Sequence, residues 1–170
     1  MEEELGFDLA ECDEDELPFV LSQPKPQPTV RGVKVQRHAT SLAVDPEIQD
    51  NGSVRVTPIG EAFRDTLLAP PLNGGIEQVV RLWRTHAGPH LDAIVPAISA
   101  TPEKIARVRA GYLLEEVLGV RDTRIATWAV DAQRGSSRKL DPSAPYIGRY
   151  SPRWMISINV DDATLPATVA

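Results

Sequence analysis

The chain has 170 residues, 42% of them apolar, and a net charge of -6, which fits one domain with a hydrophobic core. Its single cysteine, Cys12, excludes an internal disulfide framework and a cysteine-rich zinc site. No apolar run reaches the roughly 18–20 residues of a membrane-spanning helix, and the acidic N-terminal residues are unlike a secretory signal. The composition therefore predicts a cytoplasmic protein with no membrane partner.

The charge is distributed unevenly along the chain. Residues 1–16 contain nine acidic residues and no Lys or Arg, which leaves 15 acidic against 18 basic residues in the remainder. Such a block is typical of a disordered tail, which we predict for residues 1–16. The alternative is an arm that docks on a basic surface of the protein or mimics nucleic acid there.

Three short strands are predicted before the middle of the chain. Residues 17–22 form a short apolar run, and residues 31–38 alternate apolar and polar side chains. The turn signal Asp50-Asn51-Gly52 precedes the third strand, residues 53–56.

Five helices are predicted in the middle of the chain, where apolar side chains recur every three or four positions. Their apolar faces contain Ile59, Phe63 and Leu67; Ile76, Val79, Val80 and Trp83; Leu91, Ile94, Val95 and Ile98; Ile105, Val108, Tyr112 and Leu113; and Ile125, Trp128 and Ala129. Pro70 ends the first helix, and Asn73-Gly74-Gly75 breaks the chain before the second. We expect the tryptophans on these faces to lie in the core rather than to bind a ligand.

The fourth helix, residues 101–119, has the clearest signals and is predicted to lie at the centre of the fold. Thr101 is a favourable N-cap, Pro102 follows at the first helical position, and Gly119 is the expected stop.

Two strands are predicted after the helices, over residues 137–141 and 153–159. In the second, Trp154, Ile156 and Ile158 share one face. The order of elements predicts an α+β fold, in which N- and C-terminal strands form one mixed β-sheet covered by the central run of about five helices. We assign residues 17–160 to this domain and residues 161–170 to a short C-terminal tail.

Catalytic, metal and cofactor signals are weak throughout the sequence. Asp141 precedes a proline and is expected to close a turn, and Gly88-Pro89 interrupts the helical spacing of His86 and His90. No nucleophile–base pair, paired carboxylates or ligand cluster emerges. We therefore predict a protein that is not an enzyme, with no cofactor, no metal and no small-molecule substrate.

Several motifs together resemble the C-terminal domain of AbiEi-family antitoxins. They are Val56-Thr57-Pro58 leading to Asp65, Pro71-Leu-Asn-Gly-Gly-Ile76, Ala110-Gly-Tyr-Leu-Leu-Glu115, Lys139-Leu-Asp-Pro142, and Arg153-Trp154 ending in Asn159. The resemblance covers residues 17–159. Gly60-Glu61-Ala62 replaces the Glu-Arg-Thr usual in that family, and upstream of residue 17 there is only the acidic segment instead of the usual winged helix.

The resemblance implies a non-catalytic antitoxin or regulatory domain of a type IV toxin–antitoxin system. Such a domain neutralises or regulates a partner nucleotidyltransferase-like toxin in abortive phage defence. The alternative it implies is a DNA-binding transcriptional regulator of its own operon whose DNA reader is missing or separately encoded.

Basic residues interleaved with tyrosines mark the candidate partner-binding surface near the end of the chain. Its predicted residues are Arg134, Arg138, Lys139, Arg149, Tyr150 and Arg153. Charge mixed with aromatic side chains fits an acidic protein surface or nucleic acid, and an ordinary solvated rim is the remaining interpretation. We favour a protein partner over DNA because five cations do not make a strongly basic domain.

Overall fold

The computed structural model describes residues 29–30, 32–34, 45–49, 52, 54–132 and 138–165. The chain divides into two compact units, residues 1–43 and 44–170, and each is described by itself. In the first unit, β1 (Thr29–Val30) and β2 (Val33–Lys34) pair antiparallel. Of the predicted strand 31–38, the two residues of β2 are therefore described as a strand. The predicted strand 17–22 and the acidic tail lie outside the described residues.

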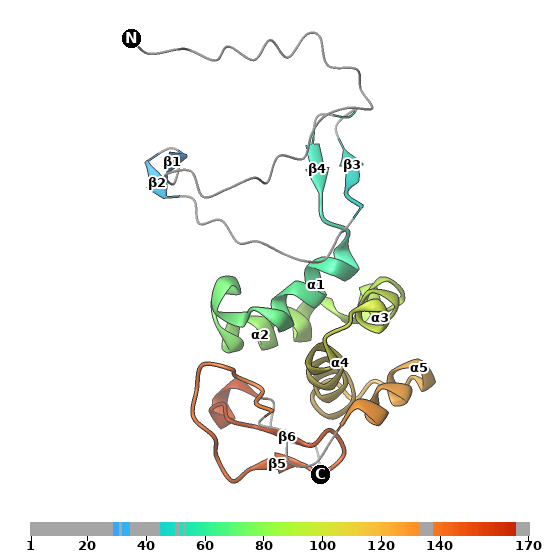
Figure 1. The fold of residues 1–170 in the computed structure, drawn as a ribbon, viewed down its shortest axis with the longest axis vertical. Coiled ribbons are helices and arrows are strands. Elements are labelled where there is room, and N and C mark those ends of the chain that lie inside the picture. The colour runs from blue at the N-terminus through green and yellow to red at the C-terminus, as the bar shows by residue number, and fades with distance from the viewer. Residues whose placement is uncertain are drawn as a thin grey trace. The chain divides into compact units, whose positions relative to one another are not determined.

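The second unit begins with a hairpin of β3 (Glu47–Gln49) and β4 (Val54–Val56), which leads into α1 (Figure 1). Gly52 has a φ of +94° in the hairpin loop, a conformation that glycine adopts without strain. The predicted strand 53–56 is confirmed to within one residue.

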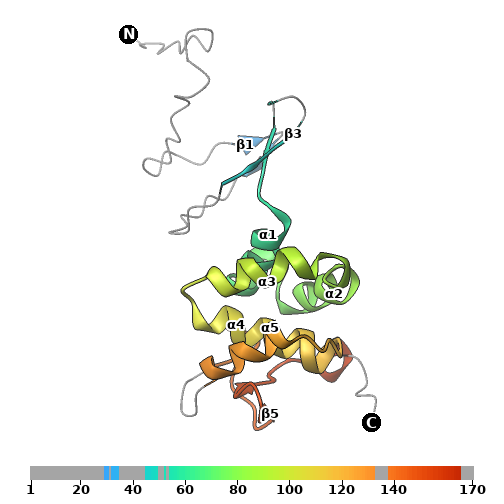
Figure 2. The ribbon, with the colours of Figure 1, turned by 90° about the vertical axis from the view of Figure 1, so that its right-hand side faces the viewer.

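The five predicted helices are all present, and two of them change type along their length. They are α1 (Ile59–Leu68), α2 (Ile76–His86), α3 (Leu91–Ala100), α4 (Lys104–Gly111), which continues as a π-helical segment (Tyr112–Val117), and α5 (Thr123–Ala126), which continues as a 3₁₀ helix (Thr127–Asp131). Figures 1 and 2 show α1, α2 and α3 in one layer and α4 and α5 in a second layer.

Glycine permits the closest contact between two helices of the first layer. A Cβ added to Gly60 in α1 would fall less than 3.0 Å from the main-chain carbonyl of Ala93 in α3. The glycine therefore lets the two helix backbones approach directly. Between α1 and α2, Gly74 and Gly75 have φ values of +82° and +86°, which confirms the predicted break.

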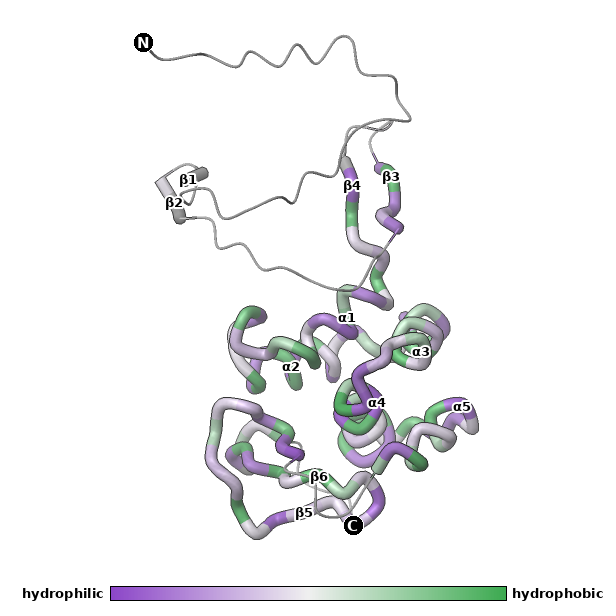
Figure 3. Tube along the Cα trace, in the orientation of Figure 1, coloured by the Kyte–Doolittle hydropathy of each residue, from purple (hydrophilic) through white to green (hydrophobic). Residues whose placement is uncertain are grey.

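One hydrophobic core joins the helices to the C-terminal segment. Its buried members include Phe63, Leu67, Val80, Trp83, Ile94, Ile98, Val108, Leu113, Leu114, Ile125, Trp128, Leu140, Trp154 and Ile156. The hydrophobic stretches of α1 to α4 that form it are visible in Figure 3. The three tryptophans are 0–3% exposed, so their predicted place in the core is confirmed.

The predicted start of the fourth helix is wrong by two residues. The helix begins at Lys104 with Glu103 as its N-cap, and the Thr101 hydroxyl donates to the Glu103 carboxylate (2.6 Å) instead of capping the backbone. Further along, the Leu118 N–H donates to the carbonyl of Leu113, five residues earlier, so one extra residue widens this turn. The predicted stop is confirmed by Gly119, whose φ is +70°.

The C-terminal strands are shorter than predicted. β5 (Tyr150–Ser151) pairs antiparallel with β6 (Ile156–Ser157), and the predicted strand 137–141 is reduced to a parallel bridge between Lys139 and Ser157. A tight turn interrupts the predicted strand 153–159, because the Met155 N–H donates to the Ser151 carbonyl (2.8 Å) and Met155 has a φ of +48°.

The α+β class is confirmed, but the single mixed sheet is not. The named strands of the described residues form three separate two-stranded antiparallel sheets. The tight turn before β6 breaks the ladder of the C-terminal strands, and each of the described strands has only two or three residues. After β6, the predicted tail contains a 3₁₀ helix (Asp162–Thr164). None of the helices within the described ranges is long and apolar enough to cross a membrane.

Candidate functional site

Five of the six predicted partner-binding residues lie in the C-terminal segment that packs on the helices. They are Arg138, Lys139, Arg149, Tyr150 and Arg153, whereas Arg134 lies outside the described residues. The five stand on or beside the loop between the Lys139 bridge and β5, or in the turn that follows β5.

Lys139 is fixed from both sides. Its ammonium donates to the Ala144 carbonyl (2.7 Å) and lies 5.5 Å from the centroid of the Tyr146 ring, within range of a cation–π contact. Its own carbonyl accepts a hydrogen bond from Nε of Arg109 (3.1 Å). The ammonium is thus held in place by a neutral acceptor and an aromatic ring, which orient its charge without cancelling it.

Arg109 holds this segment against the first helix. Its guanidinium is buried and also donates to the carbonyl of Leu67 at the end of α1 (2.5 Å). Burial lowers the pKa of Arg109 to about 10, although the charge of Asp141 opposes the shift. Arg109 was not among the predicted site residues, because helical periodicity alone does not reveal a partner that comes from the C-terminal segment.

Arg138 belongs to a second network around a buried carboxylate. It donates to the main-chain carbonyl of Asp131, whose carboxylate accepts from Nε of Arg107 (2.5 Å) and lies 3.4 Å from Nζ of Lys104. Burial raises the pKa of the Asp131 carboxyl, but the hydrogen bonds and charges of Arg107 and Lys104 together outweigh it, so the pKa is lowered. Arg138 therefore has a structural partner, the main-chain carbonyl of Asp131.

Arg153 is paired with a buried acid. Its Nη2 donates to Oε1 of Glu115 (2.9 Å), whose side chain is 6% exposed, and the hydrogen bond raises the pKa of Arg153. The next residue, Glu116, accepts from the Ser151 hydroxyl (2.6 Å). Two consecutive acids of the π-helical segment thus fasten the same turn.

Arg149 also contacts the main chain of its own segment. Nε donates to the carbonyl of Ile158 (3.3 Å), and Nη2 donates to the carbonyl of Val160 (2.9 Å). The predicted cations are therefore brought together in one segment, but each described one is held by intramolecular contacts.

Three large apolar side chains of this segment face solvent instead. Tyr146, Ile147 and Tyr150 are 43%, 42% and 49% exposed, and we call them the exposed apolar triad. Of these three, only Tyr150 was among the predicted site residues, and Ile147 is the apolar residue that the sequence pattern did not single out. The signal for it was an isoleucine next to Tyr146 in a loop bounded by Pro145 and Gly148, where no helical or strand period requires burial.

Two other predictions from the sequence concerned Asp141 as a turn residue and the histidine pair His86 and His90. The Asp141 carboxylate accepts from the Ser143 N–H (2.8 Å), which confirms the predicted turn. The 3₁₀ helix Gly88–His90 interrupts the spacing of His86 and His90, and the His90 ring packs 6.2 Å from that of Phe63. Within the described ranges, no group of three His, Cys, Asp or Glu side chains could share a metal ion.

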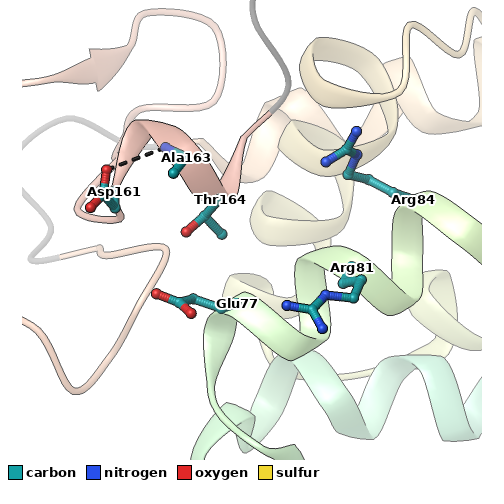
Figure 4. Close-up of a pocket in the computed structure, with 6 residues that line it drawn as sticks. All are labelled: Glu77, Arg81, Arg84, Asp161, Ala163 and Thr164. Carbon is teal, nitrogen blue, oxygen red and sulfur yellow. Dashed lines mark hydrogen bonds between the residues drawn. The ribbon is translucent and has the colours of Figure 1, made fainter.

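A polar pocket of about 190 Å³ lies between α2 and the 3₁₀ helix near the end of the chain (Figure 4). Its lining residues are Glu77, Arg81, Arg84, Asp161, Ala163 and Thr164. Sequence reasoning missed this pocket because residues 161–170 were assigned to a tail, whereas the 3₁₀ helix there packs against α2.

Comparison of the chain with protein-family models, with curated proteins and with solved structures gave no match.

Proposed function

We propose that this protein is a non-catalytic antitoxin or regulatory domain that acts in the cytoplasm by contact with a protein partner. The partner is a nucleotidyltransferase-like toxin of a phage-defence system. Support comes from the resemblance of five sequence motifs to the C-terminal domain of AbiEi-family antitoxins. Two of these motifs, Lys139-Leu-Asp-Pro142 and Arg153-Trp154, fall in the C-terminal segment that carries the candidate surface.

The observation that carries the proposal is the exposed apolar triad beside Lys139. Tyrosine and arginine are enriched in protein interfaces, where an aromatic ring supplies contact area at a small loss of conformational freedom. Arg109 and Ala144 fix the main chain and ammonium of Lys139, so this cation is ordered before a partner arrives. A surface with ordered charge and exposed apolar groups fits an acidic face of a folded partner.

The test is capture of a partner from the native host by the tagged full chain, with and without nuclease treatment. We expect a nucleotidyltransferase-like protein to be retained after nuclease. The double substitution Tyr146→Ser and Tyr150→Ser should abolish its retention, whereas the control Leu72→Ser should not. Leu72 is 48% exposed, similar to Tyr150, and lies between α1 and α2.

Loss of all retained material on nuclease treatment would contradict the proposal and favour the alternative, a DNA-binding transcriptional regulator. That alternative has a further signature, because binding through phosphate contacts weakens steeply as salt is added. If the folded double variant retained the toxin as well as the wild-type protein does, the exposed apolar triad would not be part of the interface.

A further inference from the structure

We propose that the pocket between α2 and the 3₁₀ helix Asp162–Thr164 binds a small phosphomonoester that also carries hydroxyl groups. This site is independent of the proposed antitoxin surface. Two arginines of α2 and two carboxylates line the pocket.

Arg81 and Arg84 stand three residues apart on α2, a spacing that puts them on one side of the helix. In Figure 4 the guanidinium group of Arg84 projects from α2 into the space that faces the 3₁₀ helix, and that of Arg81 points along α2 in the direction of Glu77. Neither guanidinium has an ion pair or a hydrogen bond with any residue that the structure describes. By contrast, Arg107 and Arg124 do pair with carboxylates.

Two positive charges on one side of α2, neither with an ion pair among the described residues, favour an anionic ligand. Guanidinium groups present N–H donors in a fixed fork that matches the oxygen atoms of phosphate, and a phosphomonoester carries close to two negative charges at neutral pH. Two arginines therefore match a phosphate better than they match a single carboxylate.

The opposite end of the pocket supplies acceptors and a hydroxyl. The Asp161 carboxylate accepts from the Ala163 N–H (3.2 Å), and the Asp161 carbonyl accepts from the Thr164 N–H (3.0 Å), which fixes both residues in the turn. Glu77 projects from α2 toward the same turn (Figure 4). Carboxylate oxygens accept hydrogen bonds from hydroxyl groups, so a ligand with an anionic end and a hydroxylated end satisfies both halves of the pocket.

The other ligand classes fit less well. The two guanidinium groups repel a metal cation that Glu77 and Asp161 could otherwise attract. The volume of about 190 Å³ accommodates a phosphate group together with a short polyol.

The experiment is a calorimetric titration of the full chain at low ionic strength with three probes: glycerol 3-phosphate, inorganic phosphate and glycerol. We expect glycerol 3-phosphate to bind at least tenfold more tightly than phosphate, and glycerol not to bind. Arg81→Ala and Arg84→Ala should each weaken binding about tenfold or more. The control Arg121→Ala removes one exposed positive charge elsewhere and should leave the affinity unchanged.

The variant Glu77→Gln distinguishes binding of the phosphate group from binding of the hydroxyl groups. Removal of its negative charge should leave phosphate binding unchanged or tighter, whereas the preference for glycerol 3-phosphate over phosphate should fall. Thermal unfolding of each variant verifies that it is folded.

Three results would overturn the proposal. They are no binding of either phosphate-bearing probe at millimolar concentration, equal affinity for the two, and equal losses in the Arg121→Ala control. A fourth arm uses a single-stranded oligonucleotide of twelve residues. Tighter binding of the oligonucleotide through Arg81 and Arg84 would assign these arginines to a nucleic-acid surface instead.

Discussion

Gly111 lies directly against the six-membered ring of Trp154. A Cβ at Gly111 would fall less than 3.0 Å from three carbon atoms of that ring, and Trp154 is fully buried. Gly111 is the last residue of α4 before the π-helical segment, and Trp154 stands in the turn before β6. The absence of a side chain at one position therefore creates the space in which the C-terminal segment is anchored.

We expect Gly111→Ala to lower the free energy of unfolding by about 1–3 kcal/mol, because the added methyl group must displace a buried indole. The favourable effect of alanine on helix propensity, up to about 1 kcal/mol, offsets part of the loss. Urea unfolding monitored by tryptophan fluorescence measures the change. Gly88→Ala is the control, since nothing lies within 4 Å of a Cβ at that position.

A second substitution tests the same contact from the other side. In the described structure, the buried Nε1 of Trp154 has no hydrogen-bond partner. Trp154→Phe removes this donor and part of the ring, so it should partly restore the stability of Gly111→Ala. Additive losses in the double variant would contradict the close contact.

Much of the helical part of the fold could be predicted from the sequence because its signals are local. The period of Ile76, Val79, Val80 and Trp83 encodes the buried face of α2, and Gly119 marks a helix end through its backbone freedom. The register of the C-terminal strands could not be predicted in this way. It depends on a turn at Met155 and on contacts with residues far away in the sequence.

A single hydroxyl connects α1 to the largest side chain of α2. The Thr66 hydroxyl accepts from Nε1 of Trp83 (3.0 Å) and donates to the Phe63 carbonyl (2.6 Å), all within the core. Thr66→Val keeps the shape but leaves a buried N–H without an acceptor, so we expect a loss of about 1–3 kcal/mol. Thr66→Ser retains the hydroxyl and should cost clearly less in the same denaturant titration. Equal losses would mean that the hydrogen bonds lost in Thr66→Val contribute no more than the methyl group lost in Thr66→Ser.

The pairing of Arg153 with Glu115 predicts a loss of stability when this cation is replaced. Arg153→Met leaves the Glu115 carboxylate, 6% exposed, without its partner. Complete removal of one partner of a buried pair costs about 3–5 kcal/mol, and we expect about 1–3 kcal/mol here because the arginine itself is half exposed. The double variant Arg153→Met, Glu115→Gln should recover part of the loss in a thermal unfolding cycle. No recovery would show that the two side chains do not interact.

This pair illustrates why the candidate surface could be only partly predicted. Sequence reasoning located the cations by their clustering, but clustering does not distinguish a cation that faces a partner from one that binds a carboxylate 38 residues earlier, as Arg153 does. The exposed side chains of Tyr146 and Ile147 follow from how the loop is held by Lys139 and Asn159, which are separated from each other in sequence.

The buried phenol of Tyr112 leads us to expect a change in the stability of the protein at alkaline pH. Burial raises the pKa of its phenol to about 12, and the negative charge of Glu116 adds to the shift. Because the pKa of tyrosine in the unfolded chain is about 10, the folded state holds this proton more tightly. The contribution of this protonated phenol to the free energy of unfolding is fully present below about pH 10 and is lost as the pH rises through about 12.

We therefore expect the wild-type protein to lose stability between about pH 10 and pH 12 more steeply than Tyr112→Phe, which has no proton to release. Denaturant unfolding at several pH values measures the two slopes. A tyrosinate absorbance titration of the folded proteins provides a second readout, and the component that Tyr112→Phe removes should titrate near pH 12. A component that titrates near pH 10, together with parallel stability profiles, would place this phenol in contact with water rather than in the core.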